Sequence, residues 1–150
     1  MVSLDIRWEQ PPEKLIEAFN AKFPGVLNQV VLDVTTKTQE NIMKATPVAT
    51  GNLRRNWKIR KIADCVYDLY NEVKYALWIE DGTKAHGPKT APYLHFKIGS
   101  QWIRTKKVAG IKAFKMMHDQ IQPAQDMLTL KCKEKIQQLW DAYKSFTGGY

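Results

Sequence analysis

The residues of this chain that are best suited to metal binding or covalent catalysis are its histidines and cysteines. They are His86, His95, His118, Cys65 and Cys132. Their spacing matches no zinc motif, and the sequence contains no HExxH motif, no nucleophile elbow and no glycine-rich phosphate loop. We therefore expect no catalytic residue, no bound metal and no cofactor. A zinc site assembled from these distant residues stays the alternative.

Carboxylates and basic side chains offer two further kinds of chemistry. Glu80 and Asp81 are adjacent and could bind a cation, although such neighbours more often end an element in solvent. A small basic chain could also be a metal-free ribonuclease that uses arginine and histidine in acid–base steps. The candidates for those roles are Arg54, Arg55, His86 and His95. Nothing in their spacing requires that activity.

The positive charge is concentrated in the middle of the chain. The formal net charge is +8, and residues 51–115 carry 14 Lys and Arg against 5 Asp and Glu. Such a segment attracts phosphate backbones, but it could equally face an acidic protein or keep the chain in solution. Charge alone therefore leaves nucleic acid as one of several partners.

Length and composition favour a single globular core. The chain has 150 residues, of which 44% are hydrophobic and 25% charged, so it is long and apolar enough to bury one core. No apolar run approaches the roughly 18 residues that cross a bilayer, and the N-terminus lacks a signal-peptide pattern. We expect a protein in solution, with no membrane partner and with both cysteines reduced.

Apolar periodicity predicts helices at both ends of the chain. The Pro-Pro pair at residues 11–12 opens a short helix that should end near Pro24-Gly25. Over residues 26–47 apolar side chains recur mostly at intervals of three and four, which predicts a helix of about 20 residues. A short helix is expected over residues 113–121, and Pro123 can open the last one.

Between these helices the pattern is that of strands and turns. Alternation predicts strands over residues 57–60 and 66–70, and a third apolar segment, residues 75–79, ends at the Asp81-Gly82 turn. Residues 93–108 are predicted to form a β-hairpin.

The order of these elements predicts an α+β fold. We expect an antiparallel sheet with a long N-terminal helix and a C-terminal helix packed on one face, plus a protruding basic β-hairpin. Residues 1–24 are assigned to an N-terminal extension with a short helix, and residues 25–150 to a single α+β domain.

A turn rich in threonine, proline and glycine joins the long helix to the first strand. It reads TPVATGNLRRNW, from Thr46 to Trp57. The proline stops the helix, the glycine permits a positive φ, and the hydroxyl groups can bond to nearby backbone. The structural-turn residues are Thr46, Pro47, Thr50 and Gly51.

Three motifs, in this order, resemble the neck proteins of long-tailed bacteriophages and prophages, also called head–tail joining or tail-completion proteins. TPVATGNLRRNW resembles the turn TPVxTGxLRxS/W of that family, and YALWIEDGT resembles its signature YAxxxExGT. Residues 94–117 are similar to a branch that inserts a basic hairpin before the final helix. With the preceding helix, the resemblance covers about residues 26–121.

The resemblance implies a virion structural protein without enzymatic activity. It would form a ring in the neck that joins the DNA-filled head to the tail and surrounds the DNA channel. The implied partners are other copies of the chain, neighbouring head-completion or adaptor proteins, tail-terminator proteins, and genomic double-stranded DNA contacted without sequence specificity. The implied location is the virion neck, and the host cytoplasm during assembly. A sequence-independent nucleic-acid-binding protein and a metal-free ribonuclease stay the alternatives.

A ring also requires two different complementary patches on each subunit, because a head-to-tail contact is heterologous. The candidate channel-facing or DNA-facing residues are Arg54, Arg55, Lys97, Arg104, Lys106 and Lys107. The candidate subunit-interface residues are Trp78, Glu80, Gly82, Thr83, His86, Tyr93 and Trp102.

Overall fold

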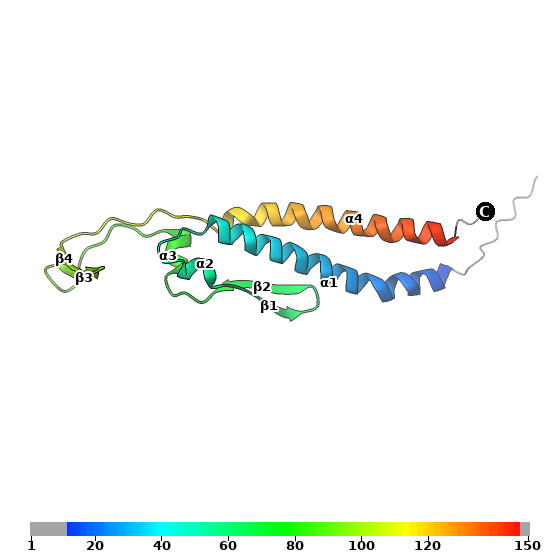
Figure 1. Ribbon diagram of the computed structural model, residues 1–150, viewed down its shortest axis with the longest axis horizontal. Helices are drawn as coiled ribbons and strands as arrows, with labels where there is room; N and C mark the ends of the chain where they lie inside the picture. The colour runs from blue at the N-terminus through cyan, green and yellow to red at the C-terminus, as the bar shows by residue number, and fades with distance from the viewer. Residues whose placement is uncertain (1–11, 148–150) are drawn as a thin grey trace, which may run out of the picture. The chain divides into compact units, whose positions relative to one another are not determined.

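The computed structural model describes residues 12–147 and has an α+β fold (Figure 1). Its elements are α1 (Pro12–Ala45), α2 (Asn52–Arg55), β1 (Trp57–Ala63), β2 (Val66–Asn71), α3 (Ala76–Asp81), β3 (Leu94–Ile98), β4 (Gln101–Thr105), the 3-10 turn η1 (His118–Gln120) and α4 (Ile121–Thr147). The predicted class, the long N-terminal helix and the C-terminal helix are confirmed. The strands pair as two separate antiparallel hairpins, β1–β2 and β3–β4, so there are two small sheets where one sheet was expected.

Helix α1 continues through the position where a break was predicted. Pro24 lies inside the helix, although a proline there removes a backbone hydrogen bond and costs about 3 kcal/mol. Apolar side chains on both sides of the proline, from Phe23 to Val30, line a seam against α4. Packing of this stripe outweighs the local signal, so the prediction of a helix end at Pro24-Gly25 was wrong.

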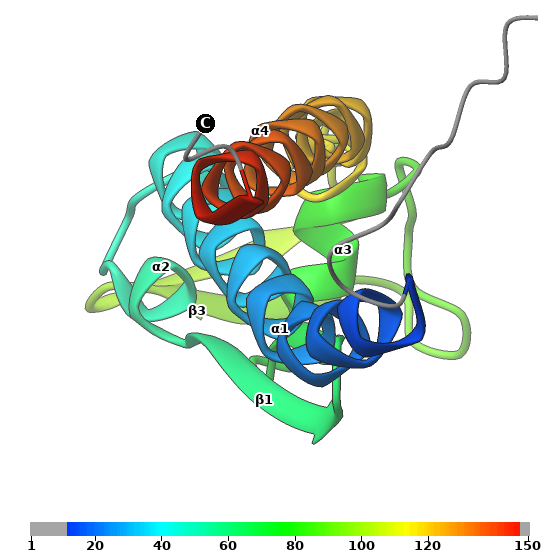
Figure 2. The same cartoon turned by 90° about the vertical axis from the view of Figure 1, so that its right-hand side faces the viewer.

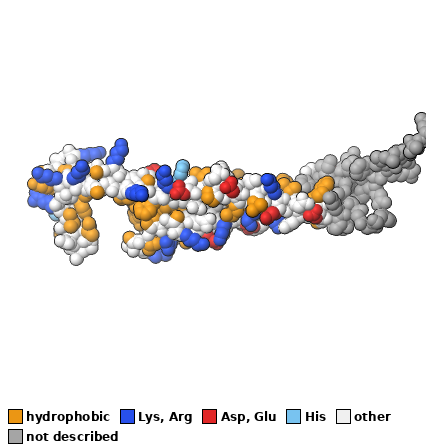
Figure 3. All heavy atoms as spheres, turned by 90° about the horizontal axis from the view of Figure 1, so that it is seen from above, with side chains coloured by type: hydrophobic (Ala, Val, Ile, Leu, Met, Phe, Trp, Pro, Cys, Tyr) orange, Lys and Arg blue, Asp and Glu red, His pale blue; other side chains and the backbone are white. Residues whose placement is uncertain are grey.

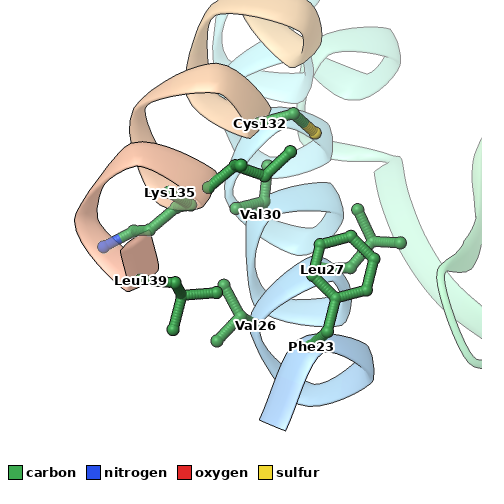
Figure 4. Close-up of a pocket in the computed structure, with 8 residues that line it drawn as sticks. Phe23, Val26, Leu27, Val30, Cys132, Lys135 and Leu139 are labelled. Carbon is green, nitrogen blue, oxygen red and sulfur yellow. The ribbon is translucent and has the colours of Figure 1, made fainter. Parts of the chain in front are cut away.

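The described residues form two compact units, and the first contains α1 up to Lys37, the hairpin segment Ile59–Asp68 and the chain from Ala124 onward. Figure 4 shows the seam between α1 and α4, where side chains of the two helices point toward each other. The lining residues are Phe23, Val26, Leu27, Val30, Cys132, Lys135, Ile136 and Leu139. The seam is thus ordinary helix-on-helix packing, and the Lys135 ammonium group points out of it.

The end of the β1–β2 hairpin is fixed to α1 by one asparagine. Asn28 Oδ1 accepts the backbone N–H of Cys65 at 2.9 Å and the hydroxyl of Tyr67 at 3.2 Å. Within this unit α1 lies between α4 and the hairpin (Figure 2). Cys65 and Cys132 do not form a disulfide.

The second unit contains Thr38–Lys58 and Leu69–Pro123. Its buried core consists of Ile42, Leu53, Trp57 and Met116. Half-buried apolar residues pack against this core: Met43, Leu69, Val73, Ala76 and Ile79. Residues from α1, α2, β1, α3 and the segment before α4 therefore meet in one cluster, which holds the motif segments in place.

Two local predictions for this unit need correction. The apolar segment at residues 75–79 belongs largely to a short helix, α3. The helix expected over residues 113–121 is absent except for the turn η1 before α4. The backbone N–H groups of Phe114 and Lys115 donate instead to the carbonyls of Ile79 and Glu80, at 3.0 and 3.1 Å. Lys115 also has a φ of 48°, in the left-handed region, so a right-handed helix cannot include this residue.

The predicted hairpin at residues 93–108 is confirmed as β3 and β4, which pair antiparallel around Gly99-Ser100. The stretches on either side run antiparallel to each other, since His86 and Val108 form a bridge with N–H···O distances of 3.1 and 2.9 Å. We call residues 83–113 the arm. In Figure 1 the hairpin lies at the end of the arm away from α3.

The ends of the chain lie outside the described residues, and with them the first part of the predicted N-terminal extension, residues 1–11, and the last residues, 148–150. The domain boundary between residues 24 and 25 stays a prediction. Within the described range, none of the helices combines the length and apolarity needed to cross a membrane.

Candidate interaction surfaces

Thr46, the first residue of the first motif, forms two buried hydrogen bonds. Its side chain is 1% exposed, and its hydroxyl donates to the Ile42 carbonyl at 2.7 Å and accepts the indole N–H of Trp57 at 2.9 Å. The hydroxyl therefore ties the end of α1 to the first residue of β1. Gly51 has a φ of 75°, as the turn was predicted to require.

The two adjacent arginines brace this turn from outside. A guanidinium nitrogen of Arg54 donates to the Thr46 carbonyl at 3.1 Å, and one of Arg55 donates to the Thr50 carbonyl at 3.3 Å. Arg54 is half-buried and Arg55 is exposed. Both lie on the short helix α2, which the sequence patterns did not predict. Their role toward a channel or DNA stays a prediction.

The second motif forms a clasp on the backbone of residues 110–118. The Glu80 carboxylate accepts the N–H groups of Met117 and His118, at 3.1 and 2.9 Å. Thr83 donates its backbone N–H to the Ile111 carbonyl at 2.8 Å, and its hydroxyl accepts the Ile111 N–H at 3.0 Å. These amides lie at the start of η1, so the carboxylate caps the 3-10 turn that leads into α4.

Glycine is required on both sides of this clasp. Gly82 has a φ of 73°, and a Cβ there would lie 2.5 Å from the Ile111 carbonyl and 2.6 Å from the Ala113 nitrogen. A Cβ on Gly110 would overlap the Thr83 carbonyl. The sequence analysis did not predict that Gly110 contacts the second motif. The only feature that could have indicated it was the position of this glycine between the hairpin and the final helix.

The arm that leaves the clasp is rich in cations. Residues 83–113 contain no Asp or Glu and seven Lys or Arg: Lys84, Lys89, Lys97, Arg104, Lys106, Lys107 and Lys112. In Figure 3, Lys and Arg gather around β3 and β4. The arm itself contains no carboxylate that could neutralise these cations, which favours their contact with an external anion.

The register of the hairpin gives it two different faces. His95 pairs with Arg104, and Lys97 pairs with Trp102, so these four side chains share one face. The His95 and Trp102 rings lie 4.8 Å apart. The other face carries apolar side chains that include Leu94, Phe96 and Ile103. The candidate cationic and aromatic residues of β3 and β4 are therefore brought together.

Tyr93 lies beneath two of the candidate DNA-facing cations. The guanidinium carbon of Arg104 is 4.1 Å from the centre of the Tyr93 ring, and the Lys106 ammonium nitrogen is 5.6 Å from it. These cation–π contacts orient both cations without neutralising them. Lys107 is exposed beside them, whereas Trp78, on α3, lies apart from this group.

The residues considered for metal or acid–base chemistry are dispersed. Among the residues that the structure describes, no three His, Cys, Asp or Glu side chains are grouped so that they could hold a metal ion. Glu80, considered as a cation ligand, is used by the clasp. His86 takes part in the backbone bridge, and His95 contacts an indole ring.

The ion pairs of the β1–β2 hairpin lie at the surface. Lys58 pairs with Glu72 at 2.6 Å, and the hydrogen bond from its ammonium group raises the Lys58 pKa. Lys61 pairs with Asp64 at 2.6 Å, which raises the pKa of the lysine and lowers that of the carboxyl. Exposed pairs of this kind contribute little to stability.

Comparison with known proteins identifies the segment that contains the first motif and most of the second. The family HK97-gp10_like, described as "Bacteriophage HK97-gp10, putative tail-component", matches residues 14–82. No curated protein and no solved structure shows significant similarity to the chain. The resemblance to phage proteins that the motifs indicated is thereby confirmed: residues 14–82 match the HK97-gp10-like family, a putative phage tail component, which supports a phage structural protein.

Proposed function

We propose that the protein forms a ring in the phage neck, where it joins the DNA-filled head to the tail and surrounds the DNA channel. It acts by docking and without catalysis. Its partners are other copies of itself, the adjacent head-completion or adaptor protein, the tail-terminator protein and the double-stranded genome. Its place is the virion neck, reached from the host cytoplasm during assembly.

The observation that carries this proposal is the acid-free arm, anchored by a motif that the phage family shares. Residues 83–113 contain seven Lys and Arg and no Asp or Glu. Arg104 and Lys106 are oriented over Tyr93, and the exposed Lys107 follows them in the chain. Cations held in this way attract phosphates but read no base sequence, which suits a channel through which any genome must pass.

Apolar exposure supports the docking half of the proposal. Leu77, Trp78, Ile98 and Trp102 are each more than half exposed in the single chain. Exposed apolar side chains of this size, on α3 and on the hairpin, favour contacts with other proteins. A subunit that meets neighbours on two sides, and other proteins above and below, needs several such surfaces.

The direct experiment disrupts the gene in a phage that carries it and examines the lysate by electron microscopy. We expect DNA-filled heads and complete tails that remain separate, and joined particles when wild-type protein is supplied in trans. Joined, infectious particles made without the protein would overturn the proposal.

The cationic and aromatic face of the hairpin also favours a second candidate, a sequence-independent nucleic-acid-binding protein. That function predicts tight, salt-sensitive DNA binding by the purified chain, lost when Lys97, Arg104, Lys106 and Lys107 are changed to alanine, while phage assembly survives. The ribonuclease alternative predicts RNA cleavage that His95→Ala abolishes. The neck proposal predicts neither outcome.

A further inference from the structure

Two exposed aromatic side chains of the second unit each lie beside an exposed charge, and the two charges have opposite signs. On α3, Leu77 and Trp78 are 64% and 59% exposed, and Asp81 is exposed at the end of the helix. On β4, Trp102 is 62% exposed and stands opposite Lys97 of β3. We call the first group the α3 patch and the second the hairpin patch.

The α3 patch follows from the two-sided character of the helix. Ala76 and Ile79 pack against the buried core, which turns the remaining side chains outward. Asp81 follows Leu77 by four residues and Trp78 by three, so the three side chains share the outer face. An apolar surface with a carboxylate at its margin is the result.

The hairpin patch is ordered before any partner arrives. Lys97 and Trp102 are a cross-strand pair, so their side chains lie on the same face. The Trp102 ring lies 4.8 Å from the His95 ring, which holds it in place. Neither Lys97 nor Asp81 forms an ion pair with another residue that the structure describes. Both charges are available to a partner.

We propose that the hairpin patch of one copy docks on the α3 patch of the next copy, an inference that rests on the ring proposed above. Trp102 packs on Leu77 and Trp78, and the Lys97 ammonium group pairs with the Asp81 carboxylate. Within one copy both patches are exposed and lie on separate parts of the second unit (Figure 1), so the contact joins different copies.

The contact is heterologous, because it uses two different patches. Each copy therefore keeps one unused patch after docking, and the chain of contacts continues until it closes into a ring. Lys97, expected from sequence to face DNA, is then assigned to the subunit contact, and Arg104, Lys106 and Lys107 remain for the phosphates.

A mixing experiment with full-length protein tests the polarity of this contact. Trp102→Ser removes the hairpin patch and Trp78→Ser removes the α3 patch, each at an exposed position. We expect wild-type protein to form assemblies larger than dimers in sedimentation velocity at high concentration, and each variant alone to stay monomeric. An equimolar mixture should form a 1:1 dimer and nothing larger, because a single intact pair of patches remains.

That dimer also shows that both variants are folded. If the wild type stays monomeric at its highest soluble concentration, if either variant assembles like the wild type, or if the mixture stays monomeric, the inference is wrong. These outcomes test the contact between copies, whereas the gene disruption tests the role in joining head and tail. A phage that needs the protein to join head and tail, together with assemblies insensitive to both substitutions, would leave the neck function standing and remove only this contact.

Charge reversal tests the ion pair. Lys97→Glu and Asp81→Lys should each weaken association about tenfold, because each places like charges opposite one another. The double variant should restore association to within about threefold of the wild type, since the pair is then reversed. Lys89→Glu, an exposed lysine of the arm outside the patch, is the matched control and should change association little. Additive losses in the double variant, or a loss of DNA binding without loss of association in Lys97→Glu, would overturn the inference.

Discussion

Replacing Thr46 by valine tests whether the first family motif works through one buried hydroxyl. Valine has nearly the same shape, so the change removes the hydroxyl and leaves little cavity. The Ile42 carbonyl keeps the backbone N–H of residue 46, at 2.9 Å, but the Trp57 indole N–H loses its acceptor. Trp57 is only 5% exposed, so water cannot replace the lost partner.

The magnitude follows from the unsatisfied indole group. A buried donor without an acceptor costs about 1–3 kcal/mol, so we expect Thr46→Val to lower the free energy of unfolding by about 2 kcal/mol. That is a large part of the roughly 5–15 kcal/mol that holds a domain together. Urea denaturation followed by circular dichroism should show an earlier midpoint with an unchanged slope.

Thr36→Val is the matched control. The Thr36 hydroxyl makes the same kind of backbone bond, to the Leu32 carbonyl at 2.9 Å, but at an exposed position of α1. Its loss should change stability by less than about 0.5 kcal/mol.

A double-mutant cycle with Trp57→Phe isolates the hydrogen bond. Phenylalanine removes the indole donor, so the valine substitution should be at least about 1 kcal/mol less damaging in the Trp57→Phe background. A Thr46→Val protein as stable as the wild type, or strictly additive losses in the cycle, would refute the role of this hydroxyl.

Three further predictions concern the clasp, α1 and the surface. Gly82→Ala should destabilise the protein by more than about 2 kcal/mol, because the added Cβ would overlap backbone atoms. Gly25→Ala has open space around it inside α1 and should stabilise the protein by about 0.5–1 kcal/mol. Equal midpoints of the two variants in thermal unfolding would contradict this. Glu80→Ala should lower the free energy of unfolding, measured by urea denaturation, by about 1–2 kcal/mol, because the amides of Met117 and His118 lose their acceptor. An unchanged midpoint would show that these hydrogen bonds do not stabilise the protein. Lys61 lowers the pKa of Asp64, so the small stabilisation from this exposed pair is present at neutral pH and is lost as the pH falls through that lowered pKa. Lys61→Met should therefore raise the Asp64 pKa in an NMR titration. An unchanged Asp64 pKa would show that the two side chains do not pair.

Much of the fold could be predicted from periodicity alone. The apolar stripe of the long helix includes Val30, Val34 and Ile42, and all three are buried. The hairpin around Gly99-Ser100 also formed where the alternation and the turn residues placed it. These elements succeed because their side-chain pattern and their turn chemistry agree with the contacts that they make.

The errors arise where a distant segment decides the local structure. Pro24 should end a helix, but the seam with α4 keeps α1 continuous. The helix expected at residues 113–121 is interrupted at Lys115, whose φ is 48°, and the amides of Phe114 and Lys115 bond to carbonyls of α3, more than thirty residues earlier in the chain. Neither competing contact is visible in a local window, so propensity and period could not have revealed it.

At the candidate site, too, local turn chemistry could be predicted from the sequence, and contacts with distant segments could not. Of the predicted turn residues, Thr46 accepts the indole N–H of Trp57, and Gly51 has the positive φ that the pattern allowed. The sequence analysis treated Glu80, Gly82 and Thr83 as interface candidates; within the chain these residues form the clasp on residues 110–118, and their role toward a neighbouring copy stays a prediction. The missing information was the position of Gly110, whose backbone approaches Thr83 too closely for any side chain.

The contacts of both motifs suggest a separation of tasks within the chain. Motif side chains bond to the chain's own backbone, as Thr46, Arg54 and Glu80 do, so they have few groups left for a partner. The exposed charges and aromatic rings lie instead on the arm and on the outer face of α3. Substitutions in the motifs should therefore lower stability first and assembly only as a consequence. Substitutions at Trp102 or Lys107 should impair assembly in a protein that unfolds at the wild-type midpoint, and the reverse pattern would show that the motifs themselves contact the neighbours.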